Sequence, residues 1–252
     1  MSRQARERSR SGIYHLMIRG INKQNLFEED EDRERFIETI GYYKTISNYI
    51  LYGYCLMDNH IHILIRETDE SISQAIKRIS SSYVYWYNQK YDRCGHLFQE
   101  RFKSEAVETE AYFLDVLRYI HQNPVRAGIT KDIRKYLWSS YHEYVRNPVI
   151  TNVDFALDIF SSDRMKAVNL FISYNNEKSI DECLDYNERI NLPDEEVIEC
   201  LTELGITSIS ELQRLEKRQR DDLLRKLKEL QGVTIRQLAR ITGISRSVID
   251  RV

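Results

Sequence analysis

The feature that most constrains this chain is a pair of histidines inside an apolar, β-branched run, DNHIHILI at residues 58–65. If this run is a strand, side chains alternate between its two faces, so His60 and His62 point the same way and the isoleucines point the other way. Two imidazoles side by side on a rigid strand can bind a metal ion as a pair. They can equally line a solvated sheet face, and a third ligand elsewhere in the chain would favour the metal.

The composition excludes several classes of protein. The 252 residues include 30% charged and 42% hydrophobic side chains with a net charge of -2, so no overall field attracts nucleic acid. No apolar run approaches the roughly 18 residues of a membrane span, and the first residues lack the apolar core of a signal peptide. We therefore expect a cytoplasmic protein with no membrane partner. Dispersed cysteines argue against a zinc site and a disulfide scaffold: Cys55, Cys94, Cys183 and Cys200.

Hydrophobic periodicity predicts seven elements before residue 124. Alternating or β-branched runs predict strands at 12–19, at 50–57, from 60 onward and at 101–107. Apolar residues at steps of three and four predict helices at 30–47, 71–91 and 109–123. The order β-α-β-β-α-β-α predicts an α+β fold, the ferredoxin-like split βαβ arrangement with one added helix. His15 lies in the first strand, and we interpret it as structural because no second ligand type is near it in sequence.

The helix expected at 109–123 carries two polar side chains that could reach the histidine pair. Tyr119 and Asn123 are four residues apart and therefore lie one turn apart on one face. Asn123 precedes Pro124, which disfavours α geometry, so we expect Asn123 in a frayed last turn with its amide reaching outward. Because the chain has 17 tyrosines, Tyr112, two turns earlier on nearly the same face, stays an alternative to Tyr119.

The pattern changes after Tyr144, where the chain becomes helical and, from residue 154, acidic. We expect a domain at 1–146, a helical linker region at 147–193 and an all-α C-terminal domain at 194–252. Periodicity predicts an acidic helix at 154–175, and a polar stretch at 187–193 predicts a linker. Further helices are expected at 194–204, 208–215 and 216–231.

The last 19 residues, 234–252, have the spacing of a helix-turn-helix. Ala239 matches the small residue where two helices touch, Gly243 matches the turn, and Ile249 matches the aliphatic residue of the second helix. The alternative is a small helical packing module, and we favour binding of duplex DNA. The second helix would then present four polar side chains to DNA: Ser245, Arg246, Ser247 and Asp250.

Four motifs occur in a characteristic order. They are RGIN at 19–22, MDNHIH at 57–62, RYIHQNPVRAG at 118–128 and WSSY at 138–141. The His-apolar-His motif alone is moderately specific, whereas the ordered set is highly specific. Through roughly residues 10–145, the chain resembles the single-tyrosine HUH transposases, and in particular the branch called REP-associated tyrosine transposases.

The resemblance implies that His60 and His62 bind a divalent metal, with Asn123 as the third protein ligand and Tyr119 as the nucleophile. Relatives often carry Gln at the third position, and Asn offers the same amide oxygen on a shorter side chain. The family cleaves single-stranded DNA beside hairpins and rejoins it through a 5′-phosphotyrosine link, which conserves bond energy without ATP. The expected metal is Mg²⁺ or Mn²⁺, of which Mn²⁺ tolerates imidazole better.

Basic side chains in the matched region are candidates for contacts with DNA phosphates. A solvated surface charge is the alternative for each one singly. The candidates are Arg19, Arg78, Arg101, Lys103 and Arg126.

Two alternative functions share this fold or this chemistry. One is a non-catalytic regulator that binds hairpin DNA, although the intact set of histidines, tyrosine and amide counts against it. The other is a relaxase-like nicking enzyme, in which the tyrosine usually precedes the histidine pair. The resemblance is compatible with a monomer or a homodimer, so the sequence leaves open whether the tyrosine acts in cis or in trans. It also predicts a prokaryotic protein associated with the nucleoid.

Overall fold

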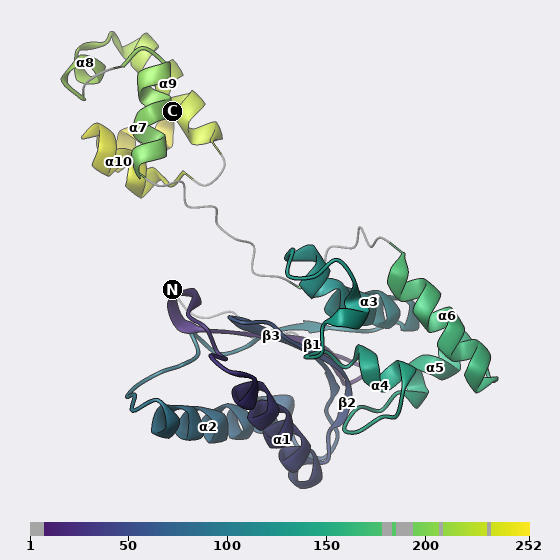
Figure 1. Ribbon diagram of the computed structural model, residues 1–252. Helices are drawn as coiled ribbons and strands as arrows, with labels where there is room; N and C mark the ends of the chain where they lie inside the picture. Colours follow the sequence, from purple (N-terminus) through teal and green to yellow (C-terminus); the bar gives the residue numbers. More distant parts are fainter. Residues whose placement is uncertain (1–7, 178–182, 185–193, 207–208, 231–232) are drawn as a thin grey trace. The chain divides into compact units, whose positions relative to one another are not determined.

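The computed structural model describes residues 8–177, 183–184, 194–206, 209–230 and 233–252. The chain divides into two compact units, Met1–Asp185 and Tyr186–Val252 (Figure 1). In the described part of the chain, no helix has the length and apolar character needed to cross a bilayer.

A four-stranded antiparallel sheet forms the centre of the first unit. Its strands are β1 (Ile13–Arg19), β2 (Ile50–Leu56), β3 (His60–Arg66) and β4 (Lys103–Ala106). Their order across the sheet is β2-β3-β1-β4, and every pairing is antiparallel. This order and the alternation of the helices with the strands confirm the predicted α+β, ferredoxin-like fold.

Two helices cover one face of the sheet, α1 (Asp30–Ser47) and α2 (Ile72–Lys90) (Figure 1). The isoleucines that alternate with the histidines in β3 point into this layer and are at most 1% exposed. They pack there with Phe36 of α1 and Ile76 of α2. Burial of this apolar face fixes the register of β3, because a slip by one residue would turn the histidines toward α1 and α2 and the isoleucines away from them.

The third helix, α3 (Glu110–Arg126), covers the opposite face of the sheet (Figure 1). Phe113 and Leu117 of α3 are buried against this face. Gly53 of β2 allows the close approach, since a Cβ atom there would come within 2.7 Å of Leu117 Cδ1. The face that carries His60 and His62 is therefore the face on which α3 lies.

The prediction that α3 frays at Asn123 and ends before Pro124 is wrong. The helix continues through Pro124 to Arg126, and the Ala127 N–H still donates to the Asn123 carbonyl at 2.9 Å. Proline in a helix removes the hydrogen bond that its own nitrogen would have made, but it leaves its carbonyl able to accept. The Pro124 carbonyl accepts from the Ile129 N–H at 2.9 Å. Asn123 is thus held in regular helix and is 7% exposed.

Short helices follow α3 within the first unit. The single helix expected at 154–175 is two helices, α5 (Asp154–Phe160) and α6 (Arg164–Asn176), separated by an extended Ser161. Asp163 caps α6 by accepting from the Lys166 N–H, so the second helix starts afresh. Both helices pack on the core formed with α3. The remaining short elements are η1 (Ile21–Lys23), η2 (Ile133–Lys135) and α4 (Tyr141–Val145).

The predicted domain boundaries at 146 and 193 stay predictions, and the linker expected at 187–193 lies outside the described residues. The second unit is helical in its described part. Its helices are α7 (Asp194–Glu203), α8 (Ile209–Arg214), α9 (Lys217–Glu229), α10 (Ile235–Thr242) and α11 (Arg246–Arg251).

Helices α10 and α11 lie at the positions expected for the helix-turn-helix. Gly243 ends α10 with a φ of 69°, a left-handed conformation that glycine adopts without strain. Leu238 and Ile249 are fully buried in the core of the unit, together with Leu224 and Leu227 of α9. The polar candidates of the second helix are all exposed: Ser245, Arg246, Ser247 and Asp250. Their role in DNA binding stays a prediction.

Candidate metal and nucleophile site

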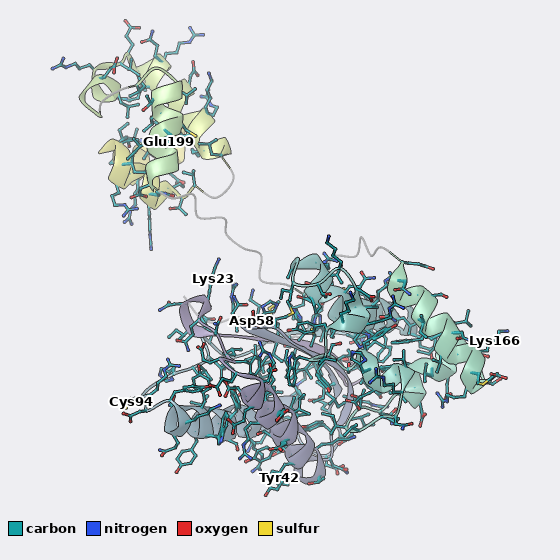
Figure 2. The ribbon with its side chains drawn as sticks, viewed as in Figure 1. Lys23, Tyr42, Asp58, Cys94, Lys166 and Glu199 are labelled. Carbon is teal, nitrogen blue, oxygen red and sulfur yellow. The ribbon has the colours of Figure 1, made fainter. Side chains whose placement is uncertain are left out.

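The turn before β3 sets the position of the histidine pair. Asp58, labelled in Figure 2, lies in this turn. Its carboxylate accepts from Arg33 Nη2 at 2.6 Å, and its carbonyl accepts from the Leu26 N–H at 2.6 Å. In the β1–β3 register, His60 faces Arg19 and His62 faces Met17. His60 is partly exposed and His62 is fully buried. One histidine therefore lies at the edge of the site and the other inside it.

Asn123 of α3 lies against both histidines. Its Oδ1 is 3.3 Å from His60 Nε2, and its Nδ2 is 3.2 Å from His62 Nε2. The opposite ring nitrogens have other partners, because His60 Nδ1 lies 2.7 Å from Asn59 Oδ1 and His62 Nδ1 lies 2.9 Å from His15 Nε2. The two Nε2 atoms and the amide of Asn123 thus converge on one point from β3 and α3.

This donor set fits a small divalent cation. Within the described residues, no group of three His, Cys, Asp or Glu side chains could hold a metal, but here the third donor is an amide. Adjacent ligands of an octahedral Mg²⁺ lie about 3 Å apart, close to the 3.3 Å between Asn123 Oδ1 and His60 Nε2. Burial, followed by the neighbouring His15 and His60, lowers the pKa of His62 well below its ordinary value of 6.5. His62 is therefore neutral, as a metal-binding imidazole must be.

Tyr119 lies beside this donor set in the same chain. Its ring centroid is 5.6 Å from that of His62 and 5.9 Å from that of His15, both edge to face. The guanidinium of Arg126 lies over the ring of Tyr119 at 4.7 Å from its centroid. Tyr119 itself is 1% exposed, so DNA can reach it only if its surroundings move. The structure brings together the four residues that the resemblance implies: His60, His62, Tyr119 and Asn123.

Tyr112, the alternative nucleophile, has different surroundings. Burial raises the pKa of Tyr112, and its hydrogen bond with the Glu105 carboxylate raises that pKa further. An acceptor carboxylate beside a phenol disfavours loss of the phenol proton. The Glu105 carboxylate therefore disfavours the phenolate that Tyr112 would need to act as a nucleophile.

The candidate DNA contacts are divided between the two faces of the sheet. Arg126 lies at Tyr119. Arg19 faces His60 across β1 and β3, and Lys103 faces Met17 across β4 and β1, so both start from the face of the histidine pair. Arg78 of α2, by contrast, binds Glu70 at 3.1 Å.

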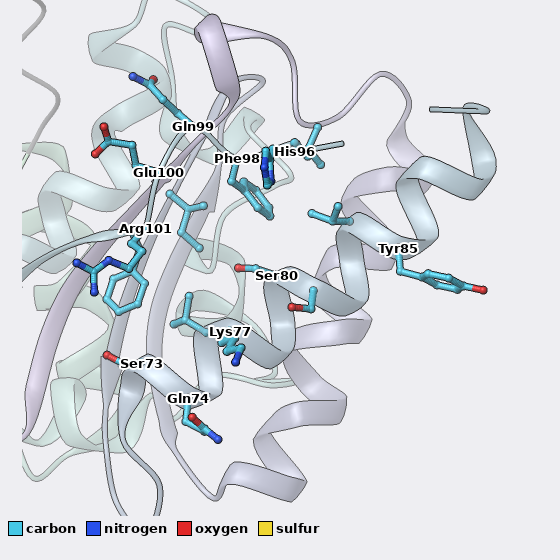
Figure 3. A pocket seen from close by; sticks show the side chains of 16 residues that line it. Ser73, Gln74, Lys77, Ser80, Tyr85, His96, Phe98, Gln99, Glu100 and Arg101 are labelled. Atoms are coloured by element: carbon cyan, nitrogen blue, oxygen red, sulfur yellow. The ribbon is translucent and has the colours of Figure 1, made fainter. Parts of the chain in front are cut away.

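Arg101 lines a hollow of about 920 Å³ between α2 and residues 96–102. Figure 3 shows Phe98 and Arg101 on one side of this hollow and Lys77 and Ser80 of α2 on the other. The hollow lies on the α2 side of the sheet, so Arg101 and Arg78 are not part of the group at His60 and His62.

A buried network of side chains, which no sequence pattern predicted, holds α3 in place. His121 Nε2 lies 2.9 Å from Ser140 Oγ, and His121 Nδ1 lies 3.1 Å from Asn175 Oδ1 of α6. Ser140 also accepts from the Tyr54 N–H of β2 at 2.9 Å. Burial lowers the pKa of His121 to about 3, so its ring is neutral. Ser140 of the WSSY motif thus connects α3, the helix that carries Tyr119, to strand β2.

Comparison with known proteins gives consistent results. Residues 9–123 match the family described as "Transposase IS200 like". A protein of Haemophilus influenzae named "Putative REP-associated tyrosine transposase" is 23% identical over 161 residues, which are 58% of this chain and 89% of that relative. A solved REP-associated tyrosine transposase bound to a REP hairpin aligns at a TM-score of 0.52 and 16% identity, over 73% of this chain and 99% of the other. At that identity, the likeness shows the fold.

The family match spans all four strands and α3 as far as Asn123. It therefore includes the strand, β3, and the helix, α3, that bring His60, His62 and Tyr119 together. The comparisons confirm the resemblance predicted from the sequence: residues 9–123 match the family "Transposase IS200 like", and two of the proteins to which the chain is similar are named REP-associated tyrosine transposases, one of them as putative.

Proposed function

We propose that this chain is a metal-dependent DNA strand transferase that cleaves and rejoins single-stranded DNA through a covalent bond to Tyr119. One observation carries the proposal. The two Nε2 atoms of His60 and His62, the amide of Asn123 and the ring of Tyr119 meet within one chain. A hairpin-binding regulator would need none of these groups together, and a simple hydrolase would need no tyrosine.

His60, His62 and Asn123 would hold Mg²⁺ or Mn²⁺. A bound divalent cation would act as a Lewis acid beside the scissile phosphate and help to orient it. Three protein donors leave further positions for phosphate oxygens and water. Asn123 and Tyr119 both belong to α3. The contact between Asn123 and the histidine pair would therefore also set the distance between Tyr119 and a phosphate bound there.

Tyr119 is the proposed nucleophile. Its phenolic oxygen would attack the phosphorus, forming an O–P bond while the P–O3′ bond breaks, and the phenol proton would pass to the leaving O3′. The products are a free 3′-hydroxyl and a 5′-phosphotyrosine. A 3′-hydroxyl of the same or another strand then attacks the phosphotyrosine, which restores a phosphodiester and returns the proton to Tyr119. No net bond is lost, so the exchange needs no ATP.

The proposed substrate is single-stranded DNA that folds into a hairpin beside the cleavage site. The support is the relative whose structure is of a REP-associated tyrosine transposase bound to a REP hairpin. Arg19, Lys103 and Arg126, which start from the site face, are the proposed phosphate contacts of the first unit. We assign duplex DNA to the second unit through the helix that begins at Arg246.

A denaturing gel tests the proposal. Hairpin-flanked single-stranded DNA is incubated with the protein and Mn²⁺, with His60→Ala, Asn123→Ala and Asn123→Gln as variants. We expect cleavage by the wild type, none with His60→Ala, a large loss with Asn123→Ala and partial retention with Asn123→Gln, which keeps the amide oxygen. A regulator would give no cleavage at all. Cleavage without transfer to a second hairpin-flanked strand would indicate a nicking enzyme instead.

A further inference from the structure

Two polar side chains lie directly behind the histidine pair, and the function proposed above does not use them. His15 of β1 and Glu105 of β4 face each other in the β1–β4 register. His62 faces Met17, two residues from His15, so His62 is the diagonal neighbour of His15 on the same face of the sheet. Three adjacent strands therefore contribute one carboxylate and two imidazoles to a single line.

The first contact of this line has the length of a hydrogen bond, and the second is a longer electrostatic contact. His15 Nε2 lies 2.9 Å from His62 Nδ1, and the two rings stack at 5.2 Å between centroids. At the other end, His15 Nδ1 lies 3.8 Å from Glu105 Oε2. Both imidazoles are fully buried, whereas Glu105 is half-buried and accepts from the Leu184 N–H at 3.1 Å. The line thus runs from the rim of the sheet to the centre of the site.

The ionisation of Glu105 indicates which ring nitrogens of His15 and His62 carry a proton. Interaction with His15, aided by Tyr112 and the Leu184 N–H, lowers the pKa of Glu105, so its carboxylate is ionised and can only accept. An ionised carboxylate favours a proton on the facing nitrogen of His15, its Nδ1. A neutral imidazole carries one proton, so Nε2 of His15 accepts and Nδ1 of His62 donates. Nε2 of His62 then keeps its lone pair toward Asn123, where the Nδ2 amide group lies at 3.2 Å.

We propose that His15 and Glu105 are positioning residues that fix the proton of His62 on Nδ1 and direct its Nε2 lone pair to the metal. The opposite tautomer would carry a proton on Nε2 and could not bind a metal there. Metal-binding histidines commonly donate their other N–H to a neighbour, and loss of that neighbour lowers metal affinity 10- to 100-fold. The inference rests on the proposed function, since it assigns His62 as a metal ligand.

Long-range ¹H–¹⁵N spectra of the metal-free full chain test the tautomer directly. The chain has six histidines, and His62→Gln identifies the signals of His62 by their loss. We expect Nδ1–H in the wild type, a shift toward Nε2–H in His15→Leu, and retention of Nδ1–H in His15→Gln, whose side-chain oxygen can still accept. A wild-type His62 with its proton on Nε2 would overturn the inference, whatever the activity of the enzyme.

Binding of Mn²⁺, followed by the loss of the free-ion signal in electron paramagnetic resonance, gives a second measurement. We expect 10- to 100-fold weaker binding in His15→Leu, and smaller losses in His15→Gln and Glu105→Gln. His142→Gln is the control, because it also replaces a histidine, but one that lies in α4 and contacts Tyr141, outside the line formed by β1, β3 and β4. Equal Mn²⁺ affinity of His15→Leu and the wild type would refute the positioning role.

The two proposals fail in different ways. If the wild type binds no Mn²⁺, the proposed metal-dependent function fails. The position of the His62 proton, measured by NMR in the metal-free chain, then still tests whether His15 and Glu105 fix the tautomer of His62. If the wild type binds Mn²⁺ and forms adducts while His15→Leu behaves like His142→Gln, only the inference fails. Should His15→Leu not fold, Glu105→Gln tests the same line from its partly exposed end.

Discussion

The ring of Tyr119 lies 5.6 Å, centroid to centroid, from the ring of His62 in the same chain. The first residue belongs to α3 and the second to β3, and the register of the sheet and the packing of α3 on Gly53 together set this separation. A tyrosine this close to the proposed metal ligands needs no second chain to complete the site.

Tyr119→Phe is expected to abolish covalent protein–DNA adducts while leaving binding of hairpin DNA within about twofold of the wild type. The variant removes one oxygen and keeps the ring that contacts His62 and Arg126. Denaturing electrophoresis with 5′-labelled or 3′-labelled DNA measures the adduct, and a mobility shift measures binding. Tyr112→Phe is the control and should keep adduct formation. Adducts that persist in Tyr119→Phe and vanish in Tyr112→Phe would reassign the nucleophile.

A mixture of Tyr119→Phe and His60→Ala should not recover adduct formation. Each variant lacks one half of the site, and in this structure both halves come from one chain. Mixing can restore activity only if the tyrosine of one chain serves the histidines of another. The measurement is adduct yield at equal total protein after co-refolding or co-expression. Recovery to about a quarter of the wild-type yield would mean that the helix carrying Tyr119 is exchanged between chains.

Arg126→Ala should weaken binding of single-stranded DNA and reduce the salt dependence of that binding by about 0.7 in the log–log slope, the value for one phosphate contact. Its guanidinium lies 4.7 Å from the centre of the ring of Tyr119, the proposed nucleophile. Arg78→Ala is the matched control, because Arg78 lies on α2 and pairs with Glu70. Equal losses of affinity in both variants would show that charge alone, and not position, matters.

Asp32→Asn is expected to destabilise the first unit by about 1–3 kcal/mol at pH 7 without changing adduct chemistry. Burial acts to raise the pKa of Asp32, but hydrogen bonds from Lys90 and from the backbone N–H groups of Glu29 and Glu28 outweigh it and lower that pKa below 3.8. A carboxyl whose pKa is lowered on folding stabilises the fold above its unfolded pKa, and this stabilisation is lost as the pH falls through the folded value.

The difference in free energy of unfolding between wild type and Asp32→Asn should therefore be constant from pH 7 to about 5 and should shrink below about 4. Urea denaturation at several pH values measures it. Asp30→Asn is the control, because the Asp30 side chain is 75% exposed and contributes little. A difference that persists unchanged at the lowest pH would mean that the neutral carboxyl is as well accommodated as the ion.

Local sequence predicted the four strands, the first three helices and part of the site. Period-two alternation in residues 60–65 predicted both the strand and the shared face of His60 and His62, because a strand has only two faces. The spacing of Tyr119 and Asn123 predicted that they lie one turn apart. Local propensity did not predict where α3 ends. The helix runs through Pro124 to Arg126, and the Pro124 carbonyl accepts from the Ile129 N–H just beyond the end of the helix.

Long-range contacts were not accessible from the sequence. His15 was interpreted as structural because nothing near it in sequence could share a ligand, yet strand pairing brings it to 2.9 Å from His62. Ser140 and Asn175 meet His121 only because α4 and α6 fold back on α3. Such contacts depend on the register of the sheet and on helix docking. The break at Ser161 that separates α5 from α6 was missed for a local reason, since the apolar period continues across it.

Arg246→Ala should weaken binding of duplex DNA several-fold and reduce its salt slope by about 0.9, without changing cleavage of single-stranded hairpins. Arg246 is the first residue of α11 and is exposed, whereas Leu238 and Ile249 hold α10 and α11 together from inside. A helix that reads a groove contacts DNA through its first turn. Arg225→Ala on α9 is the matched control, because Arg225 is exposed and already pairs with Asp222 at 2.7 Å. If both variants bind duplex DNA as the wild type does, residues 234–252 form a packing module, and recognition of DNA rests with the first unit.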